Sequence, residues 1–96
     1  MIRLFAIGLL PLAFAASAAD SLAEARSAYA RGDFTNTISH ATNSIAKNPW
    51  QEDSRVLHIR ALMAQGQFAE ARTVTTNAMA KLASSVRVRW AAHEVF

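Results

Sequence analysis

From Ser21 onward, apolar residues recur at intervals of three and four positions, which is the spacing of one face of an α-helix. Ser21, followed three positions later by Glu24, predicts a capping box that opens a first helix over residues 21–31. Gly32 has no Cβ and therefore suits the left-handed residue that closes this helix. The apolar face consists mostly of small residues: Leu22, Ala25, Ala28 and Tyr29.

The same signals predict two further helices. Asp33 can cap the second, which runs from residue 34 to about residue 47 and ends at Asn48-Pro49, because Pro disfavours a helical residue before it. The third begins between Pro49 and Ser54 and ends at Gln65. The expected inward positions are Ile38, Ala41 and Ile45 in the second helix, and Val56, Ile59, Leu62 and Met63 in the third.

Gly66 repeats the glycine turn and is followed by two more predicted helices. The fourth runs from residue 68 to about residue 81, and Ser84 or Ser85 caps the fifth. The expected inward positions of the fourth are Ala71, Val74, Ala78 and Met79, and the apolar residues of the fifth are Val86, Trp90, Val95 and Phe96.

The pattern is an internal repeat, because Gly32-Asp33-Phe34 returns 34 residues later as Gly66-Gln67-Phe68. A 34-residue period of helix, glycine turn and helix is typical of a helical solenoid. We therefore expect an all-α domain over residues 20–96, with repeats at about 21–49 and 50–83 and a partial repeat at 84–96. The period predicts a third turn glycine near position 100, past Phe96, so we expect the sequence to be a fragment or a truncated reading frame.

The first 19 residues have the features of a secretory signal peptide. Arg3 precedes an apolar run over residues 4–14, and the small residues 15–19 follow it. Cleavage after Ala18 or after Ala19 would release the mature chain, and an uncleaved N-terminal anchor is the alternative. The run is shorter than the ~20 residues that a membrane-spanning helix needs. We expect export, with the periplasm favoured over secretion.

The repeating residues resemble the tetratricopeptide repeat family over residues 21–83 and the first helix of a third repeat. The resemblance rests on Ala25, Ala28, Tyr29, Gly32, Phe34, Ile45 and Pro49, and then on Ile59, Leu62, Gly66, Phe68, Ala71 and Ala78. The sequence departs from the family in lacking a large aromatic residue early in the first helices. It also departs at Thr37 and Ser44, which replace two alanines, and at Ala83, which replaces a closing proline.

The resemblance implies antiparallel helix pairs whose first helices line a concave groove that binds a peptide or an extended segment. Carried over by register, the groove-facing residues are Arg26, Tyr29, Arg60, Met63, Trp90 and Glu94. Arginine and aromatic side chains commonly anchor interfaces. The alternative is that Tyr29 and Met63 pack between repeats and that the arginines are solvated. Leu22, Asp53 and Leu57 stand near the positions where other family members carry a lysine- and asparagine-rich clamp for a C-terminal carboxylate, which argues against that activity.

Composition narrows the function further. The chain has 10 Lys and Arg against 7 Asp and Glu, interspersed, which is an ordinary solvated surface and argues against nucleic-acid binding. Arg87 and Arg89 are interpreted as part of that surface. No Cys is present, which excludes disulfides, a thiol nucleophile and a lipid-modified cysteine anchor. Membrane contact is expected only through an uncleaved signal peptide.

Catalytic motifs are missing from the sequence. His40, His58 and His93 share no metal-binding spacing, so we expect no metal and no other cofactor. His93-Glu94 could open a His-Glu-x-x-His zinc-protease motif, but the second His would lie past Phe96. We therefore expect a non-enzymatic, exported scaffold that binds a protein or peptide. The alternative is an accessory repeat arm of a longer exported enzyme, such as a peptidase or a cell-envelope hydrolase.

Overall fold

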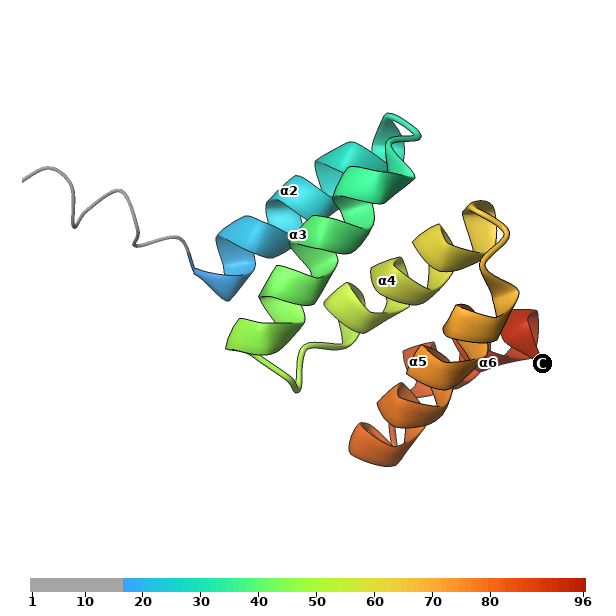
Figure 1. Ribbon diagram of the computed structural model, residues 1–96. Coiled ribbons are helices and arrows are strands. Elements are labelled where there is room, and N and C mark those ends of the chain that lie inside the picture. Colours follow the sequence, from blue (N-terminus) through green and yellow to red (C-terminus); the bar gives the residue numbers. More distant parts are fainter. Residues whose placement is uncertain (1–16) are drawn as a thin grey trace, which may run out of the picture.

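The computed structural model describes residues 17–96 and shows five α-helices and no strand over this range (Figure 1). The predicted signal peptide, residues 1–19, lies outside the described part except for its last three residues. None of the described helices is long and apolar enough to cross a membrane. The helices are α2 (Ala18–Ala30), α3 (Phe34–Lys47), α4 (Glu52–Ala64), α5 (Phe68–Lys81) and α6 (Val86–Val95).

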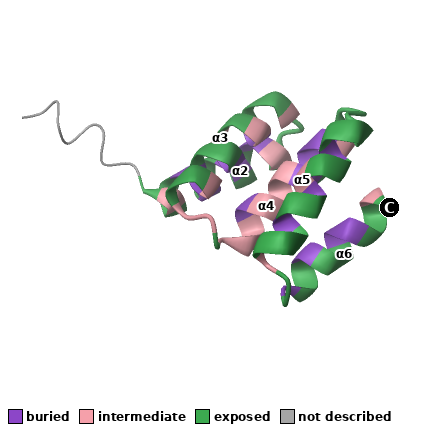
Figure 2. Ribbon diagram, turned by 60° about the horizontal axis from the view of Figure 1, so that its bottom comes forward, coloured by how far each residue is buried: buried purple, intermediate pink, exposed green. Residues whose placement is uncertain are grey.

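The helices form a row in which each one packs against the next in the sequence. In addition, α4 contacts both α2 and α6, whereas α3 and α5 make no contact with each other. The first helices of successive hairpins therefore form one layer, and α3 and α5 form the other. Figure 2 shows α4 coloured mostly as buried or intermediate. Within α4, only Arg60 and Ala64 are exposed. Contacts between sequence neighbours are the pattern of a solenoid.

The two glycine turns have the same geometry, 34 residues apart. Gly32 and Gly66 have φ values of 76° and 77°, in the left-handed region that glycine adopts without steric cost. At the first turn, Gly32 N–H donates to Tyr29 O (3.0 Å) and Asp33 N–H donates to Ala28 O (2.9 Å). The second turn repeats both bonds at the corresponding residues. This is the Schellman arrangement, which satisfies the last carbonyl groups of a helix.

The predicted caps of α3 and α6 are confirmed. The Asp33 side chain accepts from the backbone N–H and the side-chain amide of Asn36, and these hydrogen bonds lower the pKa of the Asp33 carboxyl group. Of the two candidate serines before α6, the structure selects Ser85, whose Oγ accepts from Val88 N–H at 3.1 Å. Both helices thus begin where a short acceptor side chain stands before the apolar pattern.

The predicted start of the first helix is wrong. The capping box is formed by Ser17 and Asp20, four residues before the expected pair of Ser21 and Glu24. Asp20 N–H donates to Ser17 Oγ at 3.2 Å, and Ser17 N–H donates to Asp20 Oδ2 at 3.3 Å. Ser21 is instead buried, and Lys47 Nζ on α3 donates to its hydroxyl at 3.5 Å. Packing against α3 therefore decides which of two similar sequence patterns caps the helix.

Ile59 and Val88, 1% and 0% exposed, lie at the centre of the core. They belong to one cluster with Val56, Ala78 and Ala91, which joins α4, α5 and α6. The predicted buried face of α4 is confirmed for Val56, Ile59 and Leu62, and Met63 packs against the cluster while half-buried.

The predicted inward face of α3 is displaced by one residue. Thr37, Ala41 and Ser44 are fully buried, whereas Ile38 and Ile45 are half-buried. Helix axes can approach closely only where the contacting side chains are small, and α3 packs against both α2 and α4. Ser44 Oγ lies 2.6 Å from Ser54 Oγ on α4 and donates to Ala18 O on α2 at 3.0 Å. These hydrogen bonds satisfy the serine hydroxyl groups that are buried in the core.

Two predictions near the C-terminus also need correction. Met79, expected to face inward, is 39% exposed, and Thr75 is buried on α5 in its place. On α6 the buried residues are Val88, Ala91 and Ala92. Of the predicted apolar residues of this helix, Val95 is half-buried, whereas Val86, Trp90 and Phe96 are exposed. Two alanines and a valine thus form the contact of α6 with α4 and α5, and the larger apolar side chains of α6 remain on the outside.

Candidate functional site

Ion pairs bring the first helices of successive hairpins together on one surface, which we call the α2–α4–α6 face. Asp53 on α4 lies between two arginines. Its Oδ2 is 2.5 Å from Arg26 Nη2 on α2, and its Oδ1 pairs with Arg87 Nη1 on α6. Arg60 on α4 pairs with Glu94 on α6, with 3.6 Å between Nε and Oε1. Five charged side chains from three helices thus share this face.

The six residues predicted to line a groove all belong to or border this face. Arg26, Arg60 and Glu94 take part in the ion pairs directly. Trp90 lies three positions after Arg87, so the two side chains are neighbours on α6. Trp90 is 67% exposed. The structure therefore places a solvent-accessible indole beside the charged side chains.

Tyr29 and Met63 are the most enclosed of the six. Each lies three positions after a predicted groove arginine and is half-buried. The Tyr29 ring packs edge-on against Phe34, with 5.5 Å between the ring centroids, and Met63 packs against the core cluster. Both side chains therefore contribute to packing as well as bordering the α2–α4–α6 face.

The charged side chains of this face are accessible to a partner. The exposed fraction is 57% for Arg26, 61% for Arg87 and 43% for Arg60, while Asp53 is 24% exposed. Exposed ion pairs contribute little to stability, typically 0–1 kcal/mol. Three arginines face two carboxylates, so the face carries an excess positive charge. Its chemistry suits hydrogen-bond acceptors on a partner, such as carboxylate and carbonyl oxygens.

Two members of the face, Asp53 and Arg87, were not among the residues predicted from the sequence to bind a partner. The sequence alone indicates a solvated surface position for Arg87, and for Asp53 only a departure from a carboxylate clamp. A signal was present, because Asp53 and Arg87 have opposite charges and stand 34 positions apart, as do Arg60 and Glu94. Opposite charges at the repeat spacing indicate ion pairs between neighbouring repeats.

The histidines are dispersed over the described helices. His40 lies on α3, His58 on α4 and His93 on α6, and no group of three His, Cys, Asp or Glu side chains within residues 17–96 could hold a metal ion. Glu94, the second residue of the incipient protease motif, is the residue that pairs with Arg60. The ion pair between α4 and α6 therefore explains the position of Glu94.

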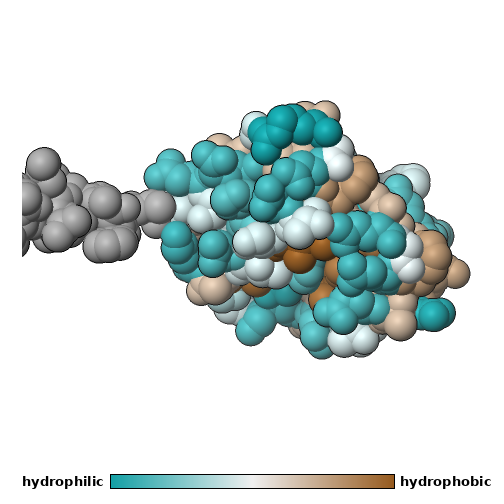
Figure 3. Space-filling model, turned by 45° about the horizontal axis from the view of Figure 1, so that its top comes forward, coloured by the Kyte–Doolittle hydropathy of each residue, from teal (hydrophilic) through white to brown (hydrophobic). Residues whose placement is uncertain are grey.

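The molecular surface is mixed in character. Figure 3 shows a face on which hydrophilic side chains predominate, with hydrophobic areas between them. Exposed large apolar side chains occur on or beside three helices: Trp50, Phe68, Met79, Val86, Trp90 and Phe96. Trp50 is partly covered by Lys81, whose Nζ lies 5.0 Å from the ring centroid. Aromatic and cationic groups are thus available at several places for contact with another molecule.

Comparison with known proteins agrees with the repeat geometry. A family model described as tetratricopeptide repeat matches residues 28–89. This range includes both glycine turns and all of α3, α4 and α5. Searches of curated proteins and of solved structures returned no match.

Proposed function

The chain belongs to the tetratricopeptide repeat family, and from this premise we propose that it is an exported scaffold that binds an extended segment of another protein on the α2–α4–α6 face. Tetratricopeptide repeats generally mediate protein–protein interactions, and the family is typically a non-catalytic scaffold. The partner is expected to be a protein or a peptide.

The observation that carries this proposal is the accessible row of charged and aromatic side chains across three helices. Arg26, Arg60 and Arg87 keep much of their guanidinium surface in contact with solvent although each has a carboxylate partner. A bound segment can therefore accept hydrogen bonds from the arginines without breaking the ion pairs that hold them in place. Arg and Trp are also the residue types that most often dominate interface energies.

A selection experiment tests the binding face. Peptides selected from a random displayed library against the full chain should lose affinity about fivefold or more when Arg60 is replaced by Ala, because truncation of a residue that dominates an interface costs more than about 1 kcal/mol. Arg72→Ala, which removes an exposed arginine from α5, is the matched control and should leave the affinity unchanged. Dissociation constants measured by isothermal titration calorimetry give the comparison.

The selection can also contradict the proposal. If Arg60→Ala and Trp90→Ala both bind the selected peptides as well as the unmodified protein does, the peptides bind elsewhere. Circular dichroism of each variant separates a loss of contact from a loss of fold.

Export is part of the proposal and rests on the pattern of residues 1–19, which combines one positive charge, an apolar run and small residues. When the full chain is expressed in a Gram-negative host, the periplasmic fraction should contain a shortened protein. Its N-terminal sequence should begin at Ala19 or Asp20. Recovery of the full-length chain in the cytosol alone would contradict export.

A further inference from the structure

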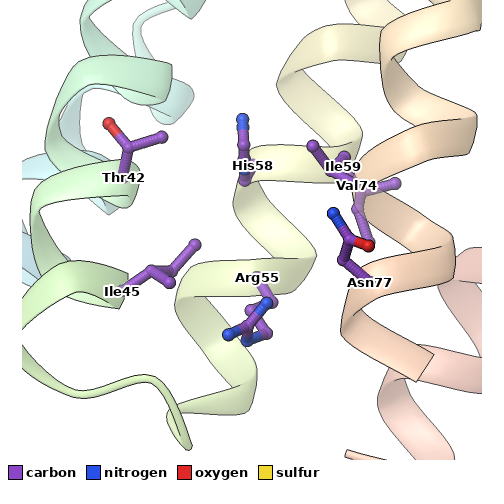
Figure 4. Close-up of a pocket in the computed structure, with 7 residues that line it drawn as sticks. All are labelled: Thr42, Ile45, Arg55, His58, Ile59, Val74 and Asn77. Carbon is purple, nitrogen blue, oxygen red and sulfur yellow. The ribbon is translucent and has the colours of Figure 1, made fainter. Parts of the chain in front are cut away.

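A pocket lies between α3, α4 and α5, on the side of α4 away from the proposed binding face. Figure 4 shows Arg55, His58 and Ile59 of α4 at its centre, Thr42 and Ile45 of α3 on one side, and Val74 and Asn77 of α5 on the other. Arg55 and His58 stand two and five positions after Asp53. An α-helix turns about 100° per residue, so both side chains are about 140–160° away from Asp53. We call this cavity the outer pocket.

The apolar part of the outer pocket can hold a small ring. Ile45, Ile59 and Val74 supply its aliphatic surface, and the cavity has a volume of about 140 Å³. A cavity of about 150 Å³ lined by Leu, Ile and Phe side chains is known to hold benzene. The space between the helices therefore suits one aromatic ring or a branched aliphatic group of similar size.

The polar part of the pocket is cationic. Arg55 is half-buried, and its Nε donates to Pro49 O at 2.9 Å, which fixes the guanidinium at one edge. Within residues 17–96, no carboxylate lies within ion-pair distance of Arg55. Burial lowers the pKa of the Arg55 guanidinium, because a partly desolvated cation lacks a compensating charge. An anion at this position would supply that charge.

His58 adds a hydrogen-bonding ring, rather than a second charge, to the pocket. Burial lowers the pKa of its imidazole; the Glu70 carboxylate opposes this effect, and Arg55 adds to it. No hydrogen bond to the His58 ring occurs within the described part of the chain, so both ring nitrogens remain available. The Asn77 amide stands across the pocket on α5 and offers a further donor.

The pocket is a feature of the repeat. A second cavity is lined by Met79, Arg89, Ala92, His93 and Phe96, and the first four of these stand 34 positions after Ile45, Arg55, His58 and Ile59. Arg89 is also anchored in the same way, because its Nη2 donates to Ala83 O, the carbonyl 34 positions after that of Pro49. An arginine that donates to a backbone carbonyl thus stands beside an apolar side chain at two places: between α3 and α4, and between α5 and α6.

We propose that the outer pocket binds a small carboxylate that carries one apolar group of about the size of a benzene ring. The ring lies against Ile45, Ile59 and Val74. The carboxylate accepts hydrogen bonds from the free edge of the Arg55 guanidinium and from the His58 ring. Charge-assisted bonds of this kind are stronger than neutral ones. This site is separate from the α2–α4–α6 face and does not depend on peptide binding there.

Benzoate is the probe that tests the proposal, with benzyl alcohol as its uncharged counterpart. In ¹H–¹⁵N NMR titrations of the full chain, benzoate should shift the amides around the outer pocket with a Kd of about 1 mM, as expected for a ligand of few atoms. Benzyl alcohol should bind at least about tenfold more weakly, because it lacks the charge. Arg55→Gln should weaken benzoate binding about tenfold, while Arg72→Gln, on the exposed side of α5, should not.

Two further measurements make the result decisive. Bound benzoate stabilises the imidazolium form, so it should raise the pKa of His58 measured from its ring protons. Asn77→Trp fills the mouth of the pocket from an exposed position and should abolish binding even if Arg55→Gln does not fold. Equal binding of benzoate and benzyl alcohol, or shifts that survive Asn77→Trp, would overturn the proposal. Tighter binding of a peptide with a C-terminal Phe than of benzoate would reassign the pocket to a protein C-terminus.

Discussion

Replacement of Ile59 by Ala is expected to lower the free energy of unfolding by about 3 kcal/mol, the middle of the range for a buried Ile. Ile59 is 1% exposed and lies in the cluster that joins α4, α5 and α6. Truncation removes three methyl or methylene groups and leaves a cavity, because the helix backbones on both sides cannot close it fully. Urea unfolding followed by circular dichroism measures the change.

The size of this effect matters because the domain is small. Domains have about 5–15 kcal/mol of stability, and short chains bury proportionally little surface. Ile59→Val should cost only about 1 kcal/mol, since it removes one methylene. Val86→Ala is the control on α6; Val86 is 64% exposed, and its loss should change stability by less than about 0.5 kcal/mol. Similar losses for Ile59→Ala and Val86→Ala would show that the cluster is not the core.

Replacement of Ala41 by Leu is expected to destabilise the fold by about 2 kcal/mol through overpacking. Ala41 is completely buried on α3, between the small buried residues Thr37 and Ser44. A leucine there adds three carbon atoms at a helix contact whose closeness depends on small side chains, so α3 must move away from α2 or α4. The hydroxyl contact between Ser44 and Ser54 would be stretched as well.

The matched control for this substitution lies on the same helix. Ala46 is exposed, and leucine has nearly the same helix propensity as alanine, so Ala46→Leu should be almost neutral. Thermal unfolding of both variants should therefore differ by several degrees in Tm, as expected for about 2 kcal/mol in a domain of this size. Equal Tm values would mean that α3 can shift without loss of packing.

Features fixed by local chemistry could be predicted from the sequence. The left-handed conformations of Gly32 and Gly66 were expected, because only glycine closes a helix in this way without steric cost. The Asp33 cap and the start of α3 at Phe34 follow from the preference of a short acceptor side chain for the position before a helix. Each of these features involves residues within one turn of each other.

The helix start at Ser17 is not determined by local sequence signals alone. Two consecutive patterns of Ser followed three residues later by an acidic residue stand at Ser17 and Ser21, and either can form a capping box. The structure uses the first, because Ser21 is buried against α3 and accepts from Lys47. A contact 26 positions away therefore decides the outcome.

Some residues of the candidate site could be predicted from the sequence, and others depended on contacts between the helices. Register predicted Arg26, Arg60 and Glu94 on the first helices, since equivalent positions of a repeat face the same direction. The ion-pair partners were not predicted, because the role of Asp53 between Arg26 and Arg87 depends on how closely α2 and α6 approach α4. The outer pocket is formed by residues of α3, α4 and α5 together. Its presence therefore depends on how the three helices are spaced, which the sequence of one helix does not specify.

The sequence by itself determined the period, the glycine turns and the order of the helices, because these depend on backbone conformation and on neighbours within a few residues. Tertiary structure decided which of two neighbouring candidate positions on a helix is buried. Apolar spacing marks a helix face only to within about one residue, so Thr37 and Ser44 displaced Ile38 and Ile45, and Met79 remained exposed. The closest contacts select small side chains, since the distance between two helix axes is set by the bulk between them.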